Sequence, residues 1–136
     1  MPKFLRSGKV VLLLQGRHAG KKAVIVKTAD EGNAARPYPH CIVVGMKRYP
    51  KTVVRAHTTK QQKDRAARLA VFVKAVNYNH IMPTRYGIDV DFKSTVTPEV
   101  VEDPSKRKQA KKAAAKMLKQ HYLAGKNKWF FQKLRF

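Results

Sequence analysis

Basic side chains dominate the last part of the chain. Between Lys106 and Phe136 there are eleven Lys or Arg residues and no Asp or Glu. Ammonium and guanidinium groups on successive turns of a helix can each neutralise a phosphate of a nucleic acid strand. This pattern therefore predicts the binding of a polyanion.

A turn bracketed by glycines near the start of the chain carries a second group of cations. Gly16 and Gly20 enclose Arg17 and His18, and two lysines follow. Backbone N–H groups and cationic side chains at the tip of a turn can follow a phosphate backbone. Glycines that serve only positive φ angles explain the same residues, so both interpretations stay open at this point.

Aromatic rings are interspersed with cations in the last residues. Trp129, Phe130, Phe131 and Phe136 lie among lysines and one arginine. Rings that stack on splayed bases beside phosphate-binding cations suit irregular RNA. The alternative is docking of these rings on the domain or on a neighbouring protein, and this is favoured more for Phe130 and Phe131 than for Trp129.

The residues expected to contact RNA share a positive charge, an imidazole or a stackable ring. They are Arg17, His18, Lys21, Lys22, Lys47, Arg48, Lys51, Arg55, Lys60, Lys63, Arg65, Arg68, His80, Arg85, Lys106, Arg107, Lys108, Lys111, Lys112, Lys116, Lys119, Lys126, Lys128, Trp129, Lys133 and Arg135. A basic run is usually a solvated face, but the high net charge favours phosphate contact for Lys47 to Arg55. His80 and Arg85 belong to a predicted loop from Asn77 to Arg85, in which the asparagines are expected to bond to local backbone.

The charge balance of the whole chain supports this interpretation. Thirty Lys and Arg against eight Asp and Glu give 136 residues a net charge of +22. Solubility of a small domain needs a net charge of only about 2 to 8. The excess indicates a nucleic-acid partner, with affinity that falls steeply as salt rises.

The residues that could serve catalysis or bind a metal lack the required spacing. Asp89 and Asp91 can share a strand face, but nothing nearby suggests a pocket. His40 and Cys41 are adjacent, so they would point to opposite faces of a strand. The five histidines show no metal-ligand spacing, and the single cysteine cannot form an internal disulfide. We therefore expect no enzyme, no metal and no cofactor.

The chain also lacks the expected signature of a membrane protein. Its longest aliphatic run, Val10 to Leu14, is too short for a membrane span or a secretory signal. One cysteine favours a reducing compartment. We expect a soluble intracellular protein with neither a membrane nor a small-molecule substrate as partner.

Short strands must position the first group of cations. The residue types predict a hairpin from Gly8–Leu14 and Lys21–Thr28, a strand at His40–Val44, another at Val71–Tyr78 and a possible one at Ile88–Phe92. The short strands of the first fifty or so residues favour a small twisted barrel.

Helices are expected to position the remaining cations. Thr58 or Thr59 can cap a helix from Lys60 to Leu69. Pairs of a capping residue and proline start two further helices, at Thr97-Pro98 and at Asp103-Pro104. The second of these runs from about Pro104 to Tyr122 and is stopped by Gly125, and its narrow apolar stripe comprises Ala110, Ala114, Met117, Leu118 and Tyr122.

The first hairpin resembles a known motif. Gly8 to Lys27 is similar to the KOW motif, the strand-loop-strand of SH3-like barrels in ribosomal proteins and transcription elongation factors. Gly16, Gly20 and Lys21 fit the motif together with the flanking aliphatic residues. Ala23 stands where the motif usually has another glycine, which affects the turn geometry more than the hairpin itself.

Two later segments sharpen the resemblance. Val76–Tyr86 and Gly125–Phe136 are similar to the family of eukaryotic large-subunit ribosomal protein twenty-seven, within the KOW-motif ribosomal proteins. The resemblance implies a structural constituent of the cytosolic large ribosomal subunit, with ribosomal RNA and neighbouring ribosomal proteins as partners and no catalytic residues. It also implies a place in the cytoplasm after assembly in the nucleus and nucleolus.

Taken together, these patterns predict an α+β protein in three parts. Residues 1–56 form a small SH3-like KOW β-barrel, residues 57–103 a helix-strand extension packed on it, and residues 104–136 a basic helix with an aromatic and basic tail. The expected function is to bind and stabilise ribosomal RNA. A KOW-type transcription or translation factor and a DNA-compacting architectural protein remain as alternatives, although the dense charge of the tail argues against the first.

Overall fold

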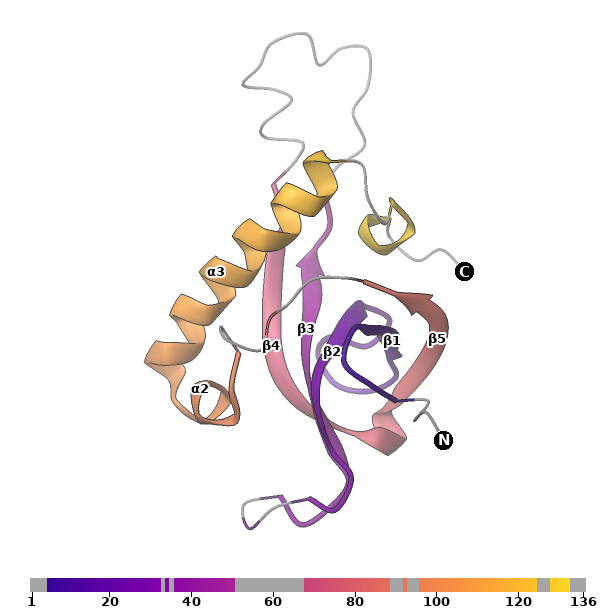
Figure 1. Cartoon of the computed structure of the whole chain (residues 1–136), viewed down its shortest axis with the longest axis vertical. Coiled ribbons are helices and arrows are strands. Elements are labelled where there is room, and N and C mark those ends of the chain that lie inside the picture. Colours follow the sequence, from indigo (N-terminus) through magenta and orange to yellow (C-terminus); the bar gives the residue numbers. More distant parts are fainter. Residues whose placement is uncertain are drawn as a thin grey trace, which may run out of the picture.

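One curved antiparallel sheet with helices against one of its faces makes up the protein (Figure 1). The computed structural model describes residues 5–32, 34, 36–50, 68–88, 92, 96–124 and 128–132. An antiparallel sheet followed along the chain by a run of helices confirms the α+β class.

Five strands form the sheet in the order β4-β3-β2-β1-β5, and every neighbouring pair is antiparallel. Their bounds are β1 Lys9–Leu13, β2 Lys22–Ala29, β3 His40–Arg48, β4 Ala70–Asn77 and β5 Ile81–Gly87. A row of paired valines crosses four of the strands, from Val10 through Val24 and Val44 to Val73. Paired β-branched side chains of this kind stabilise the register.

Both faces of the sheet are buried. The valine row lies on the outer face, where it packs with α2 (Pro98–Glu102), α3 (Pro104–Leu123) and η2 (Lys128–Phe131). A second cluster, with Val11 and Val43 at its centre, fills the inner face. Strands buried on both faces have apolar residues at nearly every position, which is why β1 to β4 contain continuous apolar runs, whereas β5 is mostly exposed.

The first hairpin is confirmed. It joins β1 to β2 through a turn in which Gly16 and Gly20 adopt φ angles of 92° and 81°. The Gly20 N–H donates to the Leu13 carbonyl at 2.7 Å and closes the turn. Both glycines therefore occupy left-handed backbone positions that other residues rarely adopt.

The loop predicted from Asn77 to Arg85 is wrong over most of its length. Only Tyr78–His80 leaves the sheet, as the 3-10 helix η1, and the chain continues directly as β5. Pro83 is tolerated in this strand because β5 is the last strand of the sheet, and no other described strand pairs with its second side. A further strand was expected at Ile88–Phe92. Ile88 and Phe92 are both buried but belong to no strand, and the residues between them are not described.

The short connection between β4 and β5 shows how strongly the sheet curls. These strands are opposite edges of the sheet, yet only the three residues of η1 join them. A flat sheet would separate its edges by four spacings of about 4.8 Å, which is about 19 Å. Four chain steps, from Asn77 to Ile81, cover at most about 14 Å. The two edges must therefore approach each other at this end, and Figure 1 shows the corresponding curvature.

Helix α3 begins where the sequence predicted. Asp103 is the N-cap, its Oδ1 accepts the Ser105 N–H at 3.0 Å, and Pro104 follows the cap. The predicted apolar stripe faces the sheet, with three members buried and two half-buried: Ala110, Ala114 and Leu118, then Met117 and Tyr122. The helix ends at Leu123, and Gly125 lies outside the described residues.

Two other expected features have mixed outcomes. Helix α2 begins at Pro98 as predicted, and the Thr97 Oγ1 accepts the Val100 N–H at 3.4 Å. The helix expected from Lys60 to Leu69 falls mostly outside the described residues, and its last two residues are not helical. The boundary placed after residue 56 stays a prediction, and strands on both sides of it belong to the same sheet.

Candidate nucleic-acid interface

The solvent-facing side of α3 carries the expected lysines. Residues three or four apart share one side of a helix, so packing of the alanine stripe against the sheet directs the other positions outward. The exposed cations are Lys106, Lys108, Lys112 and Lys116, and the half-buried ones at the border are Arg107, Lys111 and Lys119. The sequence of α3 contains no Asp or Glu, so no carboxylate within the helix offsets these charges.

The turn between β1 and β2 is fixed against β4. The imidazole of His18 stacks on the ring of Phe72, with centroids 4.0 Å apart and planes only 2° from parallel. Gly45 on β3 leaves the space for that ring, because a Cβ atom at this position would collide with the Phe72 ring. The cations of the turn are therefore held by packing and not only by the turn itself.

A lysine of β4 completes this contact. A Cβ atom added to Gly16 would lie 3.4 Å from the Nζ of Lys74, so the backbone of the turn lies close to that ammonium. Lys74 is exposed although its neighbours Phe72 and Val76 on the same side of β4 are buried. The turn thus adds its own cation, Arg17, next to a cation of the sheet.

Electrostatic effects on two side chains show which cations lie together. The pKa of His18 is lowered first by burial and then by the charges of Arg17, Lys74, Lys47 and Lys111. The pKa of Lys111 is lowered first by burial and then by Arg107, Lys47 and Arg17. We call these five cations the hairpin–helix cluster: Arg17, Lys47, Lys74, Arg107 and Lys111.

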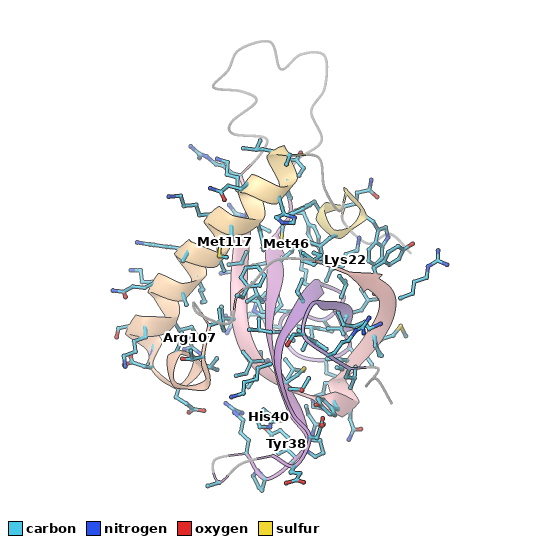
Figure 2. The ribbon with its side chains drawn as sticks, viewed as in Figure 1. Lys22, Tyr38, His40, Met46, Arg107 and Met117 are labelled. Atoms are coloured by element: carbon cyan, nitrogen blue, oxygen red, sulfur yellow. The ribbon has the colours of Figure 1, made fainter. Side chains whose placement is uncertain are left out.

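The hairpin–helix cluster joins four parts of the fold, namely the β1–β2 turn, β3, β4 and α3. Among the described residues, the charges that shift the pKa of His18 or Lys111 are all positive. Clustered like charges repel one another, and a bound anion would relieve that repulsion. The cluster has the chemistry of a phosphate site. Arg107 is labelled on α3 in Figure 2.

Lys22 is placed differently from the prediction that it contacts RNA. Its side chain is 1% exposed, and its Nζ donates to the carbonyls of Trp129 and Gln132, at 2.6 Å each. The ammonium also lies 3.9 Å from the centroid of the Trp129 ring. Burial lowers the pKa of Lys22 to about 8. This lysine therefore holds the C-terminal turn η2 against the sheet. Lys22 is labelled in Figure 2.

The aromatic residues of the tail pack on the protein itself in the described part of the chain. Phe130 and Phe131 are 1% and 4% exposed and belong to the outer-face core. Trp129 is half-buried and stacks on Tyr86 of β5, with centroids 4.4 Å apart. The docking alternative is therefore the observed arrangement for both phenylalanines. Trp129 is engaged by Tyr86 and Lys22.

His80 and Arg85 do not lie together on one loop, as the sequence predicted, but on η1 and β5. His80 is half-buried at the end of η1, and its carbonyl accepts the Leu14 N–H at 2.9 Å. Arg85 is an exposed residue of β5 whose guanidinium lies 5.3 Å from the centroid of the Tyr86 ring. Asn77 bonds to local backbone as expected, because its Oδ1 accepts the Asn79 N–H at 2.9 Å.

The remaining predicted contacts divide by what the structure describes. Lys47, Arg48 and Arg68 are exposed, and Lys21 is half-buried with its Nζ 5.5 Å from the centroid of the Tyr49 ring. The backbone of Lys128 begins η2, and nothing further is described of that residue. The other predicted residues lie outside the described residues: Lys51, Arg55, Lys60, Lys63, Arg65, Lys126, Lys133 and Arg135.

Lys74 is the member of the hairpin–helix cluster that the sequence prediction missed. It is the only charged residue of β4, whose other residues are apolar apart from a terminal asparagine. An isolated lysine within an apolar strand marks a position where one face opens to solvent. That signal was available, but it did not indicate the turn from the first hairpin as its neighbour.

The adjacent His40 and Cys41 do not form a reactive pair. Both side chains are buried, and the Nδ1 of His40 lies 3.0 Å from the Tyr38 carbonyl. Burial raises the pKa of the Cys41 thiol to about 12, so it stays protonated near neutral pH. Asp89 and Asp91, the candidate carboxylate pair, lie outside the described residues.

The described residues form neither a metal-binding cluster nor a membrane-spanning helix. No group of three or more His, Cys, Asp or Glu side chains in the described part of the chain is arranged to hold a metal ion. None of the helices found in those ranges has the length and apolar character that crossing a membrane requires.

Comparison with known proteins gives a consistent set of matches. Residues 10–136 match the model of the Ribosomal L27e protein family. The chain is 52% identical over 136 residues to the large ribosomal subunit protein eL27 of Pyrobotrys stellatus, and all of both chains is covered. The proteins of the same name from Candida albicans and Pisum sativum are 53% and 50% identical, again with full coverage of both chains.

Proposed function

This chain belongs to the Ribosomal L27e protein family, and we infer from its basic surface that it binds ribosomal RNA within the large subunit. As a member of that family it is a structural constituent of the large ribosomal subunit and takes part in translation. The observation that carries the RNA proposal is the hairpin–helix cluster, in which cations of four elements lie together. Among the described residues, no carboxylate contributes to the lowered pKa values of His18 and Lys111.

Two surfaces would contact RNA phosphates in this proposal. The first is the hairpin–helix cluster, and the second is the exposed side of α3 with Lys108, Lys112 and Lys116. The two surfaces are continuous, because Arg107 and Lys111 belong to α3 and border its exposed side. A continuous basic face of this kind suits strands of RNA that converge, since it screens the phosphates of both.

The fold is suited to this role. We propose that the curled sheet is a small SH3-like barrel whose first hairpin is a KOW hairpin. The strand order, the closing of the two edges through η1 and the glycine-bracketed turn support this. The extension of residues 57–103 and the basic helix and tail of residues 104–136 are then additions to the barrel, with α3 packed on its outer face.

The setting follows from the family. We propose that the chain works in cytoplasmic ribosomes after assembly transit through the nucleus and nucleolus. Its partners would be ribosomal RNA of the large subunit and neighbouring ribosomal proteins. Its role is to screen phosphates and fix the relative position of RNA strands, with no reaction catalysed by its own residues.

The salt dependence of binding to purified large-subunit ribosomal RNA tests the proposal. Each phosphate contact contributes about 0.7 to 0.9 to the slope of log affinity against log salt. The triple variant Lys108→Gln, Lys112→Gln, Lys116→Gln should flatten the slope by about 2 to 3. Lys27→Gln, which removes an exposed lysine of β2, should leave it nearly unchanged.

An unchanged slope in the triple variant would mean that these lysines face solvent. Co-sedimentation provides an independent check in cells. Retention on large subunits at moderate salt supports the proposal. Loss to the soluble fraction would favour a transient KOW-type factor, and retention on chromatin would favour a DNA-compacting protein.

A further inference from the structure

We propose that His18 takes up a proton when an RNA phosphate binds in the hairpin–helix cluster, and that its imidazole then donates a hydrogen bond to that phosphate. The proposal rests on the proposed function, since it takes RNA as the ligand. The hairpin–helix cluster would then be a specific phosphate site with the titrating imidazole of His18 at its centre, and not only part of a general basic surface.

The position of His18 suits such a role. Stacking on Phe72, with centroids 4.0 Å apart, fixes the plane of the imidazole, so a ligand can reach the ring nitrogens only within that plane. Within the described part of the chain neither nitrogen makes a hydrogen bond, and the residue is half-buried rather than sealed. The N–H donors of an imidazolium are therefore available to a ligand.

Within the described part of the chain, the charges that act on His18 come from its own turn and from three other elements. Arg17 lies on its own turn, Lys47 on β3, Lys74 on β4 and Lys111 on α3. All four are cations, and together with burial they lower the pKa of the imidazole below its ordinary value. In the free protein near neutral pH the ring is thus neutral.

A phosphate in the cluster reverses the balance. Its negative charge neutralises neighbouring cations and directly favours the imidazolium form, and its oxygens accept the N–H of the ring. The aromatic face of Phe72 also favours a positive charge stacked on it. The proton comes from solvent, no covalent bond changes, and the product is an imidazolium paired with a phosphodiester.

Calorimetry of the full chain with purified large-subunit ribosomal RNA measures this proton directly. Titrations at about pH 7 in two buffers of different ionisation enthalpy give the number of protons taken up on binding. The wild-type chain should take up as much as about one proton per molecule more than His18→Gln. His121→Gln, which removes a histidine of α3 outside the cluster, should show the wild-type value.

A second variant tests the same idea without touching the histidine. Lys74→Gln removes an exposed cation beside His18, so the free imidazole holds its proton more readily and the uptake on binding should fall.

The pH dependence of RNA affinity gives a third measurement. As pH falls from about 8 to about 6, the affinity of the wild-type chain for RNA should rise by up to about tenfold for each unit by which phosphate raises the pKa of His18.

The outcomes separate this inference from the proposed function. If RNA does not bind even at low salt, the proposed function fails. If RNA binds with a steep salt dependence but the wild type and His18→Gln take up the same number of protons, this inference is overturned and the function stands. If Lys74→Gln takes up as many protons as the wild type, the cluster does not control His18, and the inference is overturned as well.

Discussion

Replacing Lys22 by methionine should release the C-terminal turn η2. The buried ammonium donates to two carbonyls of η2 and its flank, at 2.6 Å each, and lies 3.9 Å from the centroid of the Trp129 ring. Its backbone N–H donates to the Tyr49 hydroxyl at 2.8 Å, a bond that the substitution keeps. Methionine has a similar length and flexibility but no donor, so the change removes the polar contacts and retains most of the packing.

The expected loss can be worked from these contacts. Two hydrogen bonds from a charged donor contribute about 3 to 6 kcal/mol together, and the cation–π contact adds about 1 to 2 kcal/mol. Burial opposes them, because the fall in the pKa of Lys22 to about 8 corresponds to roughly 3 kcal/mol. The balance leaves a loss of about 1 to 5 kcal/mol in the free energy of unfolding.

Fluorescence during urea unfolding measures this loss. Trp129 is the only tryptophan of the chain, and it lies in η2, so its emission reports directly on the docking of the turn. Lys27→Met is the matched control, since it removes an exposed lysine of the same strand and the same unit of charge. If the two variants differ by less than about 0.5 kcal/mol, Lys22 does not hold the tail and the reasoning is refuted.

Three other predictions follow from buried or packed groups. The Cys41 thiol, with a pKa of about 12, should react with Ellman's reagent only after unfolding, and prompt reaction in the native protein would show that it is accessible. Ala114→Leu should lower the free energy of unfolding by about 1 to 3 kcal/mol, because Ala114 is fully buried between α3 and the sheet. The control Ala113→Leu changes an exposed residue of the same helix and should have little effect. Equal effects of the two variants in thermal melts would contradict the packing of Ala114 against the sheet. Because the pKa of His18 is lowered in the folded state, the unfolded chain binds the proton more tightly. The free protein should therefore lose stability as pH falls below about 6.5, and His18→Gln should lose less stability over the same range. Parallel curves of stability against pH for the two proteins would contradict this prediction.

Local sequence signals predicted the elements that depend on neighbouring residues. The Asp103-Pro104 pair defined the start of α3, and Gly16 and Gly20 defined the turn of the first hairpin. Caps and positive φ angles are set within a few residues, so single residues indicate them reliably. The spacing of Ala110, Ala114 and Leu118 predicted the buried side of α3 for the same reason.

The β5 strand and the role of Lys22 depend on contacts that the local sequence does not contain. Pro83 and the nearby asparagines favoured a loop, but a place at the edge of the sheet makes proline acceptable. Lys22 directly follows a basic turn, and the sequence alone does not distinguish it from the cations Arg17 and Lys21 beside it. Only the docking of residues 129–132 on the outer face turns it into a buried donor, more than a hundred residues away along the chain.

The candidate site illustrates the same division. Arg17, Lys47 and Lys111 were predicted to contact RNA one by one from local charge. Their grouping with Lys74 depends on the stack of His18 on Phe72, which requires the small residue Gly45 on the neighbouring strand. Long-range packing of this kind has no signature in the charge pattern. The sequence therefore indicated the chemistry of the interface, and the fold indicates which cations act together.

A density map of an intact large subunit containing this chain tests the central claim most directly. The account predicts RNA phosphates against the hairpin–helix cluster and along the exposed side of α3, where Lys112 and Lys116 lie. A map in which these surfaces face open solvent, or are covered by protein alone, would contradict it.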